Sequence, residues 1–423
     1  MKYNLTKRYK KNRVDKIERN KKRRNRHVVT YYRNRSSIKD SPRAKSPTIM
    51  PSSIELFSDI KKQSRDRHTF TAPRVFSLTK NPDETISFIK IVSSCFYYDG
   101  NIEITINFDK TTDIDIAAIS LLDIIIVEGF EYFKKIGKVA RVKGSYPDDF
   151  NAKWIFAQTG LPKYIDPTAP ISYGEILLNP LDKIEKDSGT ETHKIVSYYN
   201  RCLQTAGYYL NDKGKAYLQS LINENAIIHS NGESPLYYST GFYNFGESKG
   251  QLSIISLGNS IYDTITSKET DFRFISEMNK LKDIHRNLHY MEYSEDNLLT
   301  LYALQDGISS KRSEMEPDRG TGTIKFIEAF MMLGQTTNES IKPKMSIVSG
   351  KTHILFDGKY TLTTTENGAK RIAFNKENDL TKKPDPNYVK ELEYSFPGVA
   401  INIEFYIDGN YLEKLGRKDE RKD

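Results

Sequence analysis

The sequence predicts an α/β protein with two folded domains, and three observations carry this prediction. Its 423 residues are enough for roughly two or three domains of about 150 residues each. Apolar residues make up 37% and aromatic residues 11% of the chain, which supplies a buried core and excludes wholesale disorder. Short apolar runs also alternate with longer runs of helical spacing, which is the pattern of α/β folds.

Positive charge is concentrated at the N-terminus. Residues 1–45 carry 18 Lys or Arg against 3 acidic residues, a net charge of +15, whereas the other residues carry a net charge of −6. A block this basic repels itself, so we expect a disordered arm that orders on an anionic partner such as RNA or DNA. The alternatives are a solvated arm without specificity and a protein-docking arm. The candidate phosphate contacts are Arg23, Arg24, Arg26, Arg33 and Arg35.

The first folded domain is expected over residues 71–183, after an arm and linker over residues 1–70. The linker is predicted from the stretch 41–53, which carries three prolines among serines. Folding is expected to start near residue 70. Short apolar runs at 86–91 and 101–108 predict strands, and the stretch 138–150 predicts a strand and a turn.

Two helices are predicted in the first domain. The longer one covers the apolar stretch from Ile116 to Phe130 and beyond, in which apolar residues recur at helical spacing. A shorter one lies near 154–158 and is closed by Gly160. Asp113 and Asp115 precede the long helix, and we expect them to form a solvated loop that caps its N-terminus.

The second domain is expected over residues 184–410, followed by a charged tail over residues 411–423. Helices are predicted at 192–210, at 214–229 and within 269–306. Strands are predicted at 237–243, 251–256, 344–349, 353–356, 359–365 and 400–406. Helices on one side of a mixed sheet would make an α/β sandwich.

Composition also excludes several classes of protein. Cys95 and Cys202 are the only cysteines, and two isolated thiols build neither a disulfide framework nor a metal site. The longest apolar stretch carries Asp123 and Glu128 and is shorter than the roughly 20 residues that a membrane helix needs. No apolar segment of a secretory signal follows the basic start. We therefore expect a cytoplasmic protein without membrane segments.

Five short stretches of the second domain carry the candidate chemistry. In chain order they are SLINENAIIHS, LSIISLGNSI, DGISSKR, RGTGTIKFI and FPGVAINIEF. Together they resemble the GHKL superfamily of ATP-binding domains, a Bergerat-type α/β sandwich found in histidine kinases, anti-sigma kinases and gyrase. The NAIIH core of the first stretch resembles the anti-sigma kinase branch. The resemblance implies a domain that binds ATP with Mg²⁺.

The helix and the glycine loop supply the expected phosphate and metal contacts. The amide oxygen of Asn225 is a suitable ligand for Mg²⁺, which prefers hard oxygen donors. Gly320 and Gly322 let the backbone approach phosphate oxygens, and the helix that begins at about Thr323 directs free amides toward them.

Further contacts are expected from a lid and from the base-binding end of a strand. Ser310 and Lys311 lie in a polar loop that can fold over the nucleotide. Lys311 or Arg319 would supply charge toward the terminal phosphates. Gly258 permits a tight turn beside the base, next to Ser256, which occupies the position of the aspartate that reads the adenine amino group in the family.

Several residues differ from the family pattern, and these differences affect the expected rate of ATP hydrolysis. Active relatives carry a glutamate four residues before the asparagine as general base, and this position is Leu221 here. Glu224 is adjacent to the asparagine but lies about 100° around the helix. Ser256 replaces the family aspartate, and Val399 replaces the usual threonine of the closing strand. We therefore expect nucleotide binding with weak or absent hydrolysis.

The first domain resembles the STAS domain, the fold of anti-sigma factor antagonists. The resemblance rests on the strand IEITINF, on the DIDIAAISLL turn into a helix, and on PDDF before a second helix. Antagonists carry a phosphorylated serine directly after an aspartate at the helix start, whereas Asp115 is followed here by Ile116 and Ala117. The resemblance implies a docking or dimerisation module for a protein partner.

The sequence thus predicts a cytoplasmic regulatory protein in which an adenine nucleotide orders the lid and changes what the rest of the protein contacts. The alternative is a nucleic-acid-binding or scaffold protein with a degenerate GHKL fold, in which the basic arm supplies the affinity. A weak ATPase with an unidentified base is a third possibility.

Overall fold

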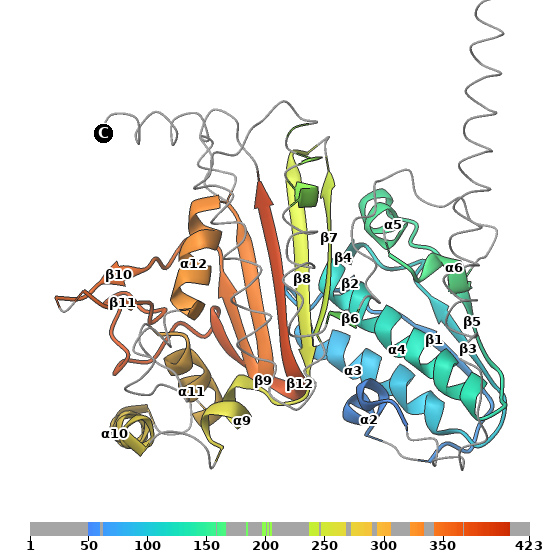
Figure 1. The fold of residues 1–423 in the computed structure, drawn as a ribbon, viewed down its shortest axis with the longest axis horizontal. Helices are drawn as coiled ribbons and strands as arrows, with labels where there is room; N and C mark the ends of the chain where they lie inside the picture. The colour runs from blue at the N-terminus through green and yellow to red at the C-terminus, as the bar shows by residue number, and fades with distance from the viewer. Residues whose placement is uncertain are drawn as a thin grey trace, which may run out of the picture. The chain divides into compact units, whose positions relative to one another are not determined.

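The computed structural model confirms a mixed α/β architecture, with parallel and antiparallel sheets and helices packed against them (Figure 1). From Met50 onward the described residues belong to one compact unit. The structure describes residues 50–59, 62–157, 159–165, 183–184, 197–199, 201–202, 204, 237–244, 247–267, 272–289, 294–305, 322–333, 342–366 and 368–406.

The strands of the N-terminal half are parallel. Strands β1 (Arg67–Thr71), β3 (Ile102–Asn107) and β5 (Ala140–Ser145) form a sheet in the order β1-β3-β5. The short strands β2 (Val75–Phe76) and β4 (Asp113–Ile114) also pair in parallel. The strands expected at 101–108 and within 138–150 are confirmed.

Helices precede, connect and follow these parallel strands along the chain. They are α2 (Ser52–Phe57), α3 (Pro82–Ser94), α4 (Ile116–Lys135), α5 (Phe150–Ala157) and α6 (Pro162–Ile165), with a short 3-10 helix η1 (Cys95–Tyr97) after α3. The long helix predicted from Ile116 is confirmed, and its first half is almost completely buried. The shorter helix predicted near 154–158 is α5, which begins and ends a few residues earlier.

The strand expected at 86–91 is wrong, because this segment lies inside α3. The helix begins with Pro82 at its first turn and carries Asp83 and Glu84 there, which favours a helix N-terminus. Ile86 and Ile89 are fully buried, three residues apart on one side of the helix. The β-branched residues of this segment suggest a strand, but helical packing decides its structure.

The expected start of folding near residue 70 is also corrected. Helix α2 lies within and just after the proposed linker, and its Ile54 and Phe57 are fully buried in the core. Strand β1 begins at Arg67 and pairs with β3. The Pro and Ser residues of this segment suggest a linker. Two apolar side chains one helical turn apart nevertheless anchor α2 in the core.

The C-terminal half contains a sheet of five described strands. They are β6 (Lys183–Ile184), β7 (Tyr237–Asn244), β8 (Lys249–Leu257), β12 (Val389–Tyr406) and β9 (Lys344–Phe356), in this spatial order. Each described pair is antiparallel, so the expectation of a mixed sheet is corrected. For β7 and β8, antiparallel pairing follows because a short hairpin connection joins the two strands.

Several strand boundaries differ from those expected. The strands predicted at 344–349 and 353–356 are one continuous strand, β9, in which Gly350 has a positive φ of 56°. The strand predicted at 400–406 is the end of the longer β12. Of the strand predicted at 359–365, only β10 (Thr363–Thr364) forms, paired with β11 (Lys370–Arg371).

The described helices of the C-terminal half are α9 (Ile261–Ile265), α10 (Phe272–His289), α11 (Glu295–Ala303) and α12 (Gly322–Leu333). Helices α10 and α11 confirm the helical content predicted within 269–306. Of the helix predicted at 192–210, the described residues 197–199, 201, 202 and 204 are helical. The helix predicted at 214–229, the basic arm and the tail at 411–423 lie outside the described residues.

Both faces of the five-stranded sheet are covered, which corrects the expectation of helices on one side. One face packs against α9, α11 and α12 through an apolar cluster that includes Ile254, Ile347 and Ile401. We call it the helix-bearing face. The other face packs against α3 and α4 of the N-terminal half, and its Ile255 and Ala400 belong to the same apolar cluster as α4. Figure 1 shows α3 and α4 beside this sheet.

Polar contacts reinforce this shared core. Glu128 of α4 accepts a hydrogen bond from the Tyr238 hydroxyl of β7 at 2.8 Å and another from the Ser53 hydroxyl of α2 at 2.5 Å. Asp83 of α3 accepts from Lys390 Nζ at 3.2 Å and from the Glu393 amide at 2.7 Å. The regions expected as two domains are therefore joined by a continuous core and by these bonds.

Candidate functional site

Ser256 and Gly258, two of the expected adenine contacts, lie at the end of β8. Ser256 pairs with Val399 of β12, and Val399 pairs in turn with Ser349 of β9. Because side chains alternate along a strand, Ser256 shares the helix-bearing face with Ile254 and Val399. The GHKL resemblance selects Ser256 and Val399 from stretches far apart in the sequence, and the strand register makes them neighbours.

Two glycines with positive φ flank this row. Gly258 has a φ of 132° and Gly398 a φ of 126°, values that other residues rarely adopt. A Cβ on Gly398 would lie 2.0 Å from the carbonyl oxygen of Ser256, whereas a Cβ on Gly258 would meet no atom of the described residues within 4 Å. Close approach of β12 to β8 therefore requires glycine at 398, and Gly258 leaves open space beside the end of β8.

Helix α9 begins next to the same row. The Ser349 hydroxyl accepts a hydrogen bond from the Ile261 amide at 2.8 Å. Ser260 caps α9, since its hydroxyl accepts from the Asp263 amide while the Asp263 carboxylate accepts from the Ser260 amide. Local sequence thus fixes the turn from β8 into α9, with Gly258 inside that turn.

The other expected site residues are described only in part. Gly322 is the first residue of α12, so the glycine stretch leads directly into a helix as expected. Ile324 and Ile327 of this helix pack in the same apolar cluster as Val399. The remaining expected contacts lie outside the described residues: Asn225, Ser310, Lys311, Arg319 and Gly320, together with Leu221 and the arm residues Arg23, Arg24, Arg26, Arg33 and Arg35.

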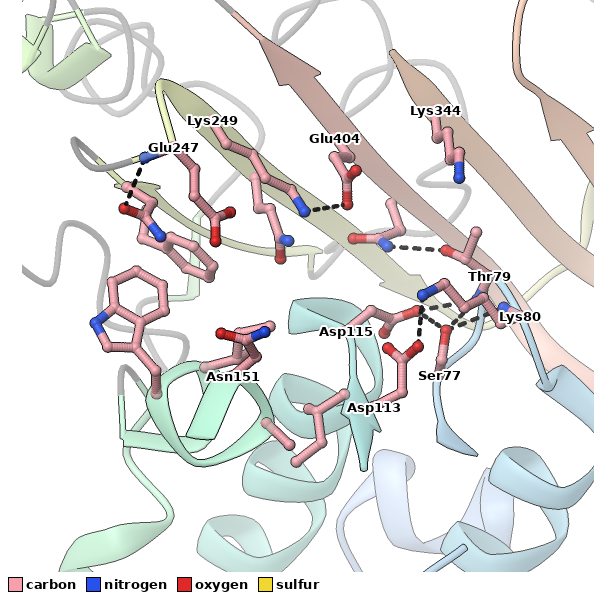
Figure 2. Close-up of a pocket in the computed structure, with 18 of the residues that line it drawn as sticks. Ser77, Thr79, Lys80, Asp113, Asp115, Asn151, Glu247, Lys249, Lys344 and Glu404 are labelled. Carbon is pink, nitrogen blue, oxygen red and sulfur yellow. Dashed lines mark hydrogen bonds and ion pairs between the residues drawn. The ribbon is translucent and has the colours of Figure 1, made fainter. Parts of the chain in front are cut away.

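A second site candidate is a cleft of about 430 Å³ on the opposite face of the sheet (Figure 2). The sequence reasoning did not identify it. One wall comes from the loops that follow β2 and β4, and another from α5, which follows β5. In α/β proteins, ligands bind in the crevice at the carboxyl ends of parallel strands. We call this feature the polar cleft, and its central residues are Thr79, Asp115, Trp154, Gln251, Asn402 and Glu404.

The sheet wall of the polar cleft is built from aligned polar residues. Gln251 of β8 pairs with Glu404 of β12, which pairs with Lys344 of β9. In the next row, Asn402 lies between Ser253 and Ser346. One further row along the strands, Ile255, Ala400 and Val348 are buried in the cluster that contains α4. The cleft therefore opens where the face of the sheet changes from apolar to polar.

The loop wall is held by Asp115, the N-cap of α4. Its carboxylate accepts hydrogen bonds from the Ala118 amide at 2.8 Å, the Ser77 hydroxyl at 2.6 Å and the Thr79 amide at 2.9 Å. Burial raises the pKa of Asp115, and these hydrogen bonds oppose that rise. The expected capping role is confirmed. The expectation of a solvated loop is wrong for this residue, because the Asp115 side chain is buried.

Thr79 joins the two walls. Its hydroxyl lies 2.8 Å from the Ser346 hydroxyl and accepts a hydrogen bond from Asn402 Nδ2 at 2.8 Å. The Asn402 amide nitrogen is therefore used, whereas its Oδ1 is buried without a hydrogen-bond partner. Gln251 Oε1 is likewise buried and unpartnered. Exposed fractions of 6% for Gln251 and 9% for Asn402 mean that water satisfies these acceptors poorly.

The charges of the polar cleft are mostly paired. Lys80 Nζ lies 2.5 Å from Asp113, and Lys249 Nζ lies 2.8 Å from Glu404. Figure 2 shows both pairs, together with Lys344 and Glu247 on the sheet side of the cleft. Counting Asp115, four carboxylates and three ammonium groups line it. The cleft therefore lacks the excess positive charge that a polyphosphate would need.

Aromatic side chains form the remaining wall. The Trp154 ring contacts Phe242 edge to face, with 4.9 Å between the ring centroids. Phe150, at the start of α5, is 78% exposed although it is large and apolar. Trp154 is the only tryptophan of the chain and lines this cleft, so tryptophan fluorescence is sensitive to changes there.

A sequence signal for the cleft does exist. Polar and apolar residues alternate in three strands, over the stretches KGQLSI, INIEF and KMSI. This alternation places apolar side chains on one face of the sheet and Lys, Gln, Ser, Asn or Glu on the other face. Such alternation commonly indicates a solvated face. Only the pairing register shows that the polar positions of the three strands align beneath another part of the protein.

No family model matches the chain, and no curated protein or solved structure matches it either. Within the part of the chain that the structure describes, no group of three or more His, Cys, Asp or Glu residues is placed to hold a metal ion. Among those same residues, no helix is long and apolar enough to cross a membrane.

Proposed function

We propose that this chain is a cytoplasmic regulatory protein whose C-terminal half binds an adenine nucleotide with Mg²⁺ on the helix-bearing face. The observation that supports this most is the row of Ser256, Val399 and Ser349. Two residues that the GHKL resemblance selects separately pair there, beside a glycine turn with open space. An adenine would lie at the end of β8, where the Ser256 hydroxyl accepts a hydrogen bond from its amino group.

The phosphate side of this proposal rests on the glycine stretch. Helix α12 begins at Gly322, and helix N-termini present free amides that suit phosphate oxygens. Asn225 would hold Mg²⁺ through its amide oxygen, and Lys311 or Arg319 would contact the terminal phosphates. Hydrolysis is weak or absent in this proposal, because Leu221 occupies the position of the family's general base.

The shared core offers a route for a nucleotide signal. Strands β8 and β12 carry the proposed adenine contacts on one face, and on the other face they pack against α3 and α4. Ordering of the lid by nucleotide would favour one of two arrangements of these strands. Because α3 and α4 pack against the strands, the surface that the N-terminal half offers to a protein partner would change with them. The STAS resemblance of that half suits such a docking role.

The direct test is isothermal titration of the full chain with Mg²⁺ and the non-hydrolysable analogue AMP-PNP. We expect saturable binding by the wild type and loss of at least about tenfold in affinity for Asn225→Ala, because the metal ligand is removed. Asn223→Ala makes the same change two positions away in the sequence and serves as the control. Equal affinity for Asn225→Ala and the wild type would contradict the metal assignment.

The adenine contact has its own matched pair of variants. Ser256→Ala removes a hydroxyl on the helix-bearing face, whereas Ser253→Ala removes one from the opposite face of the same strand. We expect Ser256→Ala to weaken AMP-PNP binding about threefold to tenfold, which corresponds to one hydrogen bond, and Ser253→Ala to leave it unchanged. A larger loss of AMP-PNP affinity in Ser253→Ala than in Ser256→Ala would contradict a nucleotide site on the helix-bearing face.

The charge asymmetry of the chain favours a second activity, nucleic-acid binding by the basic arm. Residues 1–45 hold the net positive charge, and the rest of the chain is acidic. Deletion of residues 1–45 is expected to abolish binding to RNA or DNA and its salt dependence in a filter-binding titration. Unchanged binding by the truncated chain would refute a role for the arm.

A further inference from the structure

We propose that the polar cleft is a second ligand site, which binds a neutral nucleoside, separately from the nucleotide proposed on the opposite face. The two faces of one sheet would then serve two ligands. The observations that carry this inference are two buried unpartnered acceptors, an aromatic wall and charges of which most are already paired.

The unpartnered acceptors call for a ligand with hydrogen-bond donors. Gln251 Oε1 and Asn402 Oδ1 line the cleft, are more than nine-tenths buried and receive no hydrogen bond. A buried acceptor without a donor costs free energy in the empty protein. A ligand that brings N–H or O–H groups to both atoms recovers this cost, so the site selects for donors.

The two side-chain amides favour a ligand with a planar ring that carries both donors and acceptors on its edge. The orientation of the Asn402 amide is set by its bond to Thr79, which in turn contacts Ser346. Among the described residues, none donates a hydrogen bond to Gln251 Oε1, so this oxygen remains available to a ligand. An amide side chain can pair with the edge of an adenine base by accepting from its amino group and donating to a ring nitrogen.

The aromatic wall and the charges of the cleft indicate the other properties of the ligand, namely an aromatic base and no phosphate. Phe150 is unusually exposed for an apolar residue and offers a ring on which a base can stack, and Trp154 lines the same cleft. The paired Lys80 and Lys249 leave no cluster of free cations, and four carboxylates line the same space. The cleft therefore offers a phosphate group no excess of positive charge, and a neutral ribose needs none. A volume of about 430 Å³ suits a ligand of nucleoside size.

The experiment is a titration of the full chain with adenosine, followed by the fluorescence of Trp154, the single tryptophan. We expect a saturable change with a dissociation constant below about 1 mM. Adenosine monophosphate is expected to bind at least about threefold more weakly, because its phosphate meets the carboxylates. Absence of a saturable change with adenosine up to about 1 mM, or tighter binding of the monophosphate, would overturn the proposal.

Variants assign the signal to the cleft. Gln251→Leu removes the acceptor and is expected to weaken adenosine binding about tenfold, whereas the same change at Gln63, which lies outside the cleft, leaves binding unchanged. Phe150→Ala changes a side chain that is 78% exposed, so it tests stacking with little effect on the stability of the fold. We expect severalfold weaker adenosine binding by this variant. Wild-type affinity in both Gln251→Leu and Phe150→Ala would place adenosine outside the cleft.

The two proposals fail separately. Asn225→Ala is expected to lose AMP-PNP binding and to retain the adenosine signal of Trp154. Loss of the adenosine signal in Asn225→Ala, together with its retention in Gln251→Leu, would mean that adenosine occupies only the nucleotide site, which would overturn the proposal for the cleft.

Discussion

His353 shows how one buried side chain couples the two halves of the protein to pH. It lies on β9 opposite Lys390, is 5% exposed, and its ring bonds to the Thr79 backbone. Burial, with a smaller contribution from Lys390, lowers the pKa of His353 from 6.5 to about 4, and the nearby Asp83 opposes this. The neutral ring is therefore the form that the folded protein accepts.

The sign of the pH effect follows from this lowered pKa. The unfolded chain takes up a proton at His353 below pH 6.5, but the folded protein does so only near pH 4. Stability from this group is fully present above pH 6.5 and is lost as the pH falls toward 4. We expect a loss of up to about 3 kcal/mol, measured by urea unfolding at each pH.

The variant His353→Gln is expected to flatten this part of the pH profile, because it cannot take up the proton. His68→Gln, at a partly exposed histidine of β1, is the control and should keep the wild-type slope. Identical slopes for His353→Gln and the wild type between pH 6.5 and 4 would show that His353 does not carry the effect.

The joint between β8 and β12 depends on a single glycine. Gly398 and Gly258 both have positive φ, but only a Cβ at 398 would overlap a backbone atom, the Ser256 carbonyl oxygen. We expect Gly398→Ala to lower the free energy of unfolding by at least about 3 kcal/mol, and Gly258→Ala by about 1 to 2 kcal/mol from backbone strain alone. Denaturant midpoints of the two variants measure this difference, and equal losses would contradict the close approach of β12 to β8.

Elements with strong local signals are those that the sequence predicts well. Helix α4 has a long apolar period and Asp115 as its cap, and β7 and β8 are short apolar runs with a turn between them. Within α3, the segment 86–91 alone predicts a strand because it is rich in β-branched residues, whereas Pro82 and the acidic first turn lie before this segment. A longer stretch that includes Pro82 and the acidic first turn indicates a helix.

The polar cleft could not be predicted from local sequence. Gln251, Asn402 and Lys344 each lie on a strand that alternates polar and apolar residues, which is typical of a solvated face. Their meeting depends on the register of β8, β12 and β9 and on the packing of a loop at Thr79 far away in the chain. The pairing of Ser256 with Val399 likewise depends on strand register, because the two residues come from stretches far apart in the sequence.

The described part of the chain from Met50 onward is held by an apolar core that passes from the N-terminal half into the five-stranded sheet. Ile255 of β8 is 1% exposed and belongs to the cluster that contains α4. We expect the described halves to unfold in one cooperative transition, and Ile255→Ala to destabilise that transition by about 2 to 5 kcal/mol. Ile91→Ala, at a residue that is 50% exposed, is the control with little expected effect.

Scanning calorimetry separates these outcomes. A single peak that Ile255→Ala shifts as a whole would show that the two halves share one core. Two peaks, of which Ile255→Ala moves only one, would mean that the halves unfold independently, and a nucleotide signal could then not cross the sheet as proposed.

Hydrogen–deuterium exchange of the full chain, with and without Mg²⁺ and AMP-PNP, tests the central claim most directly, because it locates the nucleotide on one face of the sheet. The account predicts slower exchange at the end of β8 and the start of α9, around residues 256–261, and at the start of α12, around residues 322–326, since bound nucleotide suppresses local opening there. Slower exchange confined to α5 and the loop at Thr79, or no change anywhere, would contradict a nucleotide site on the helix-bearing face.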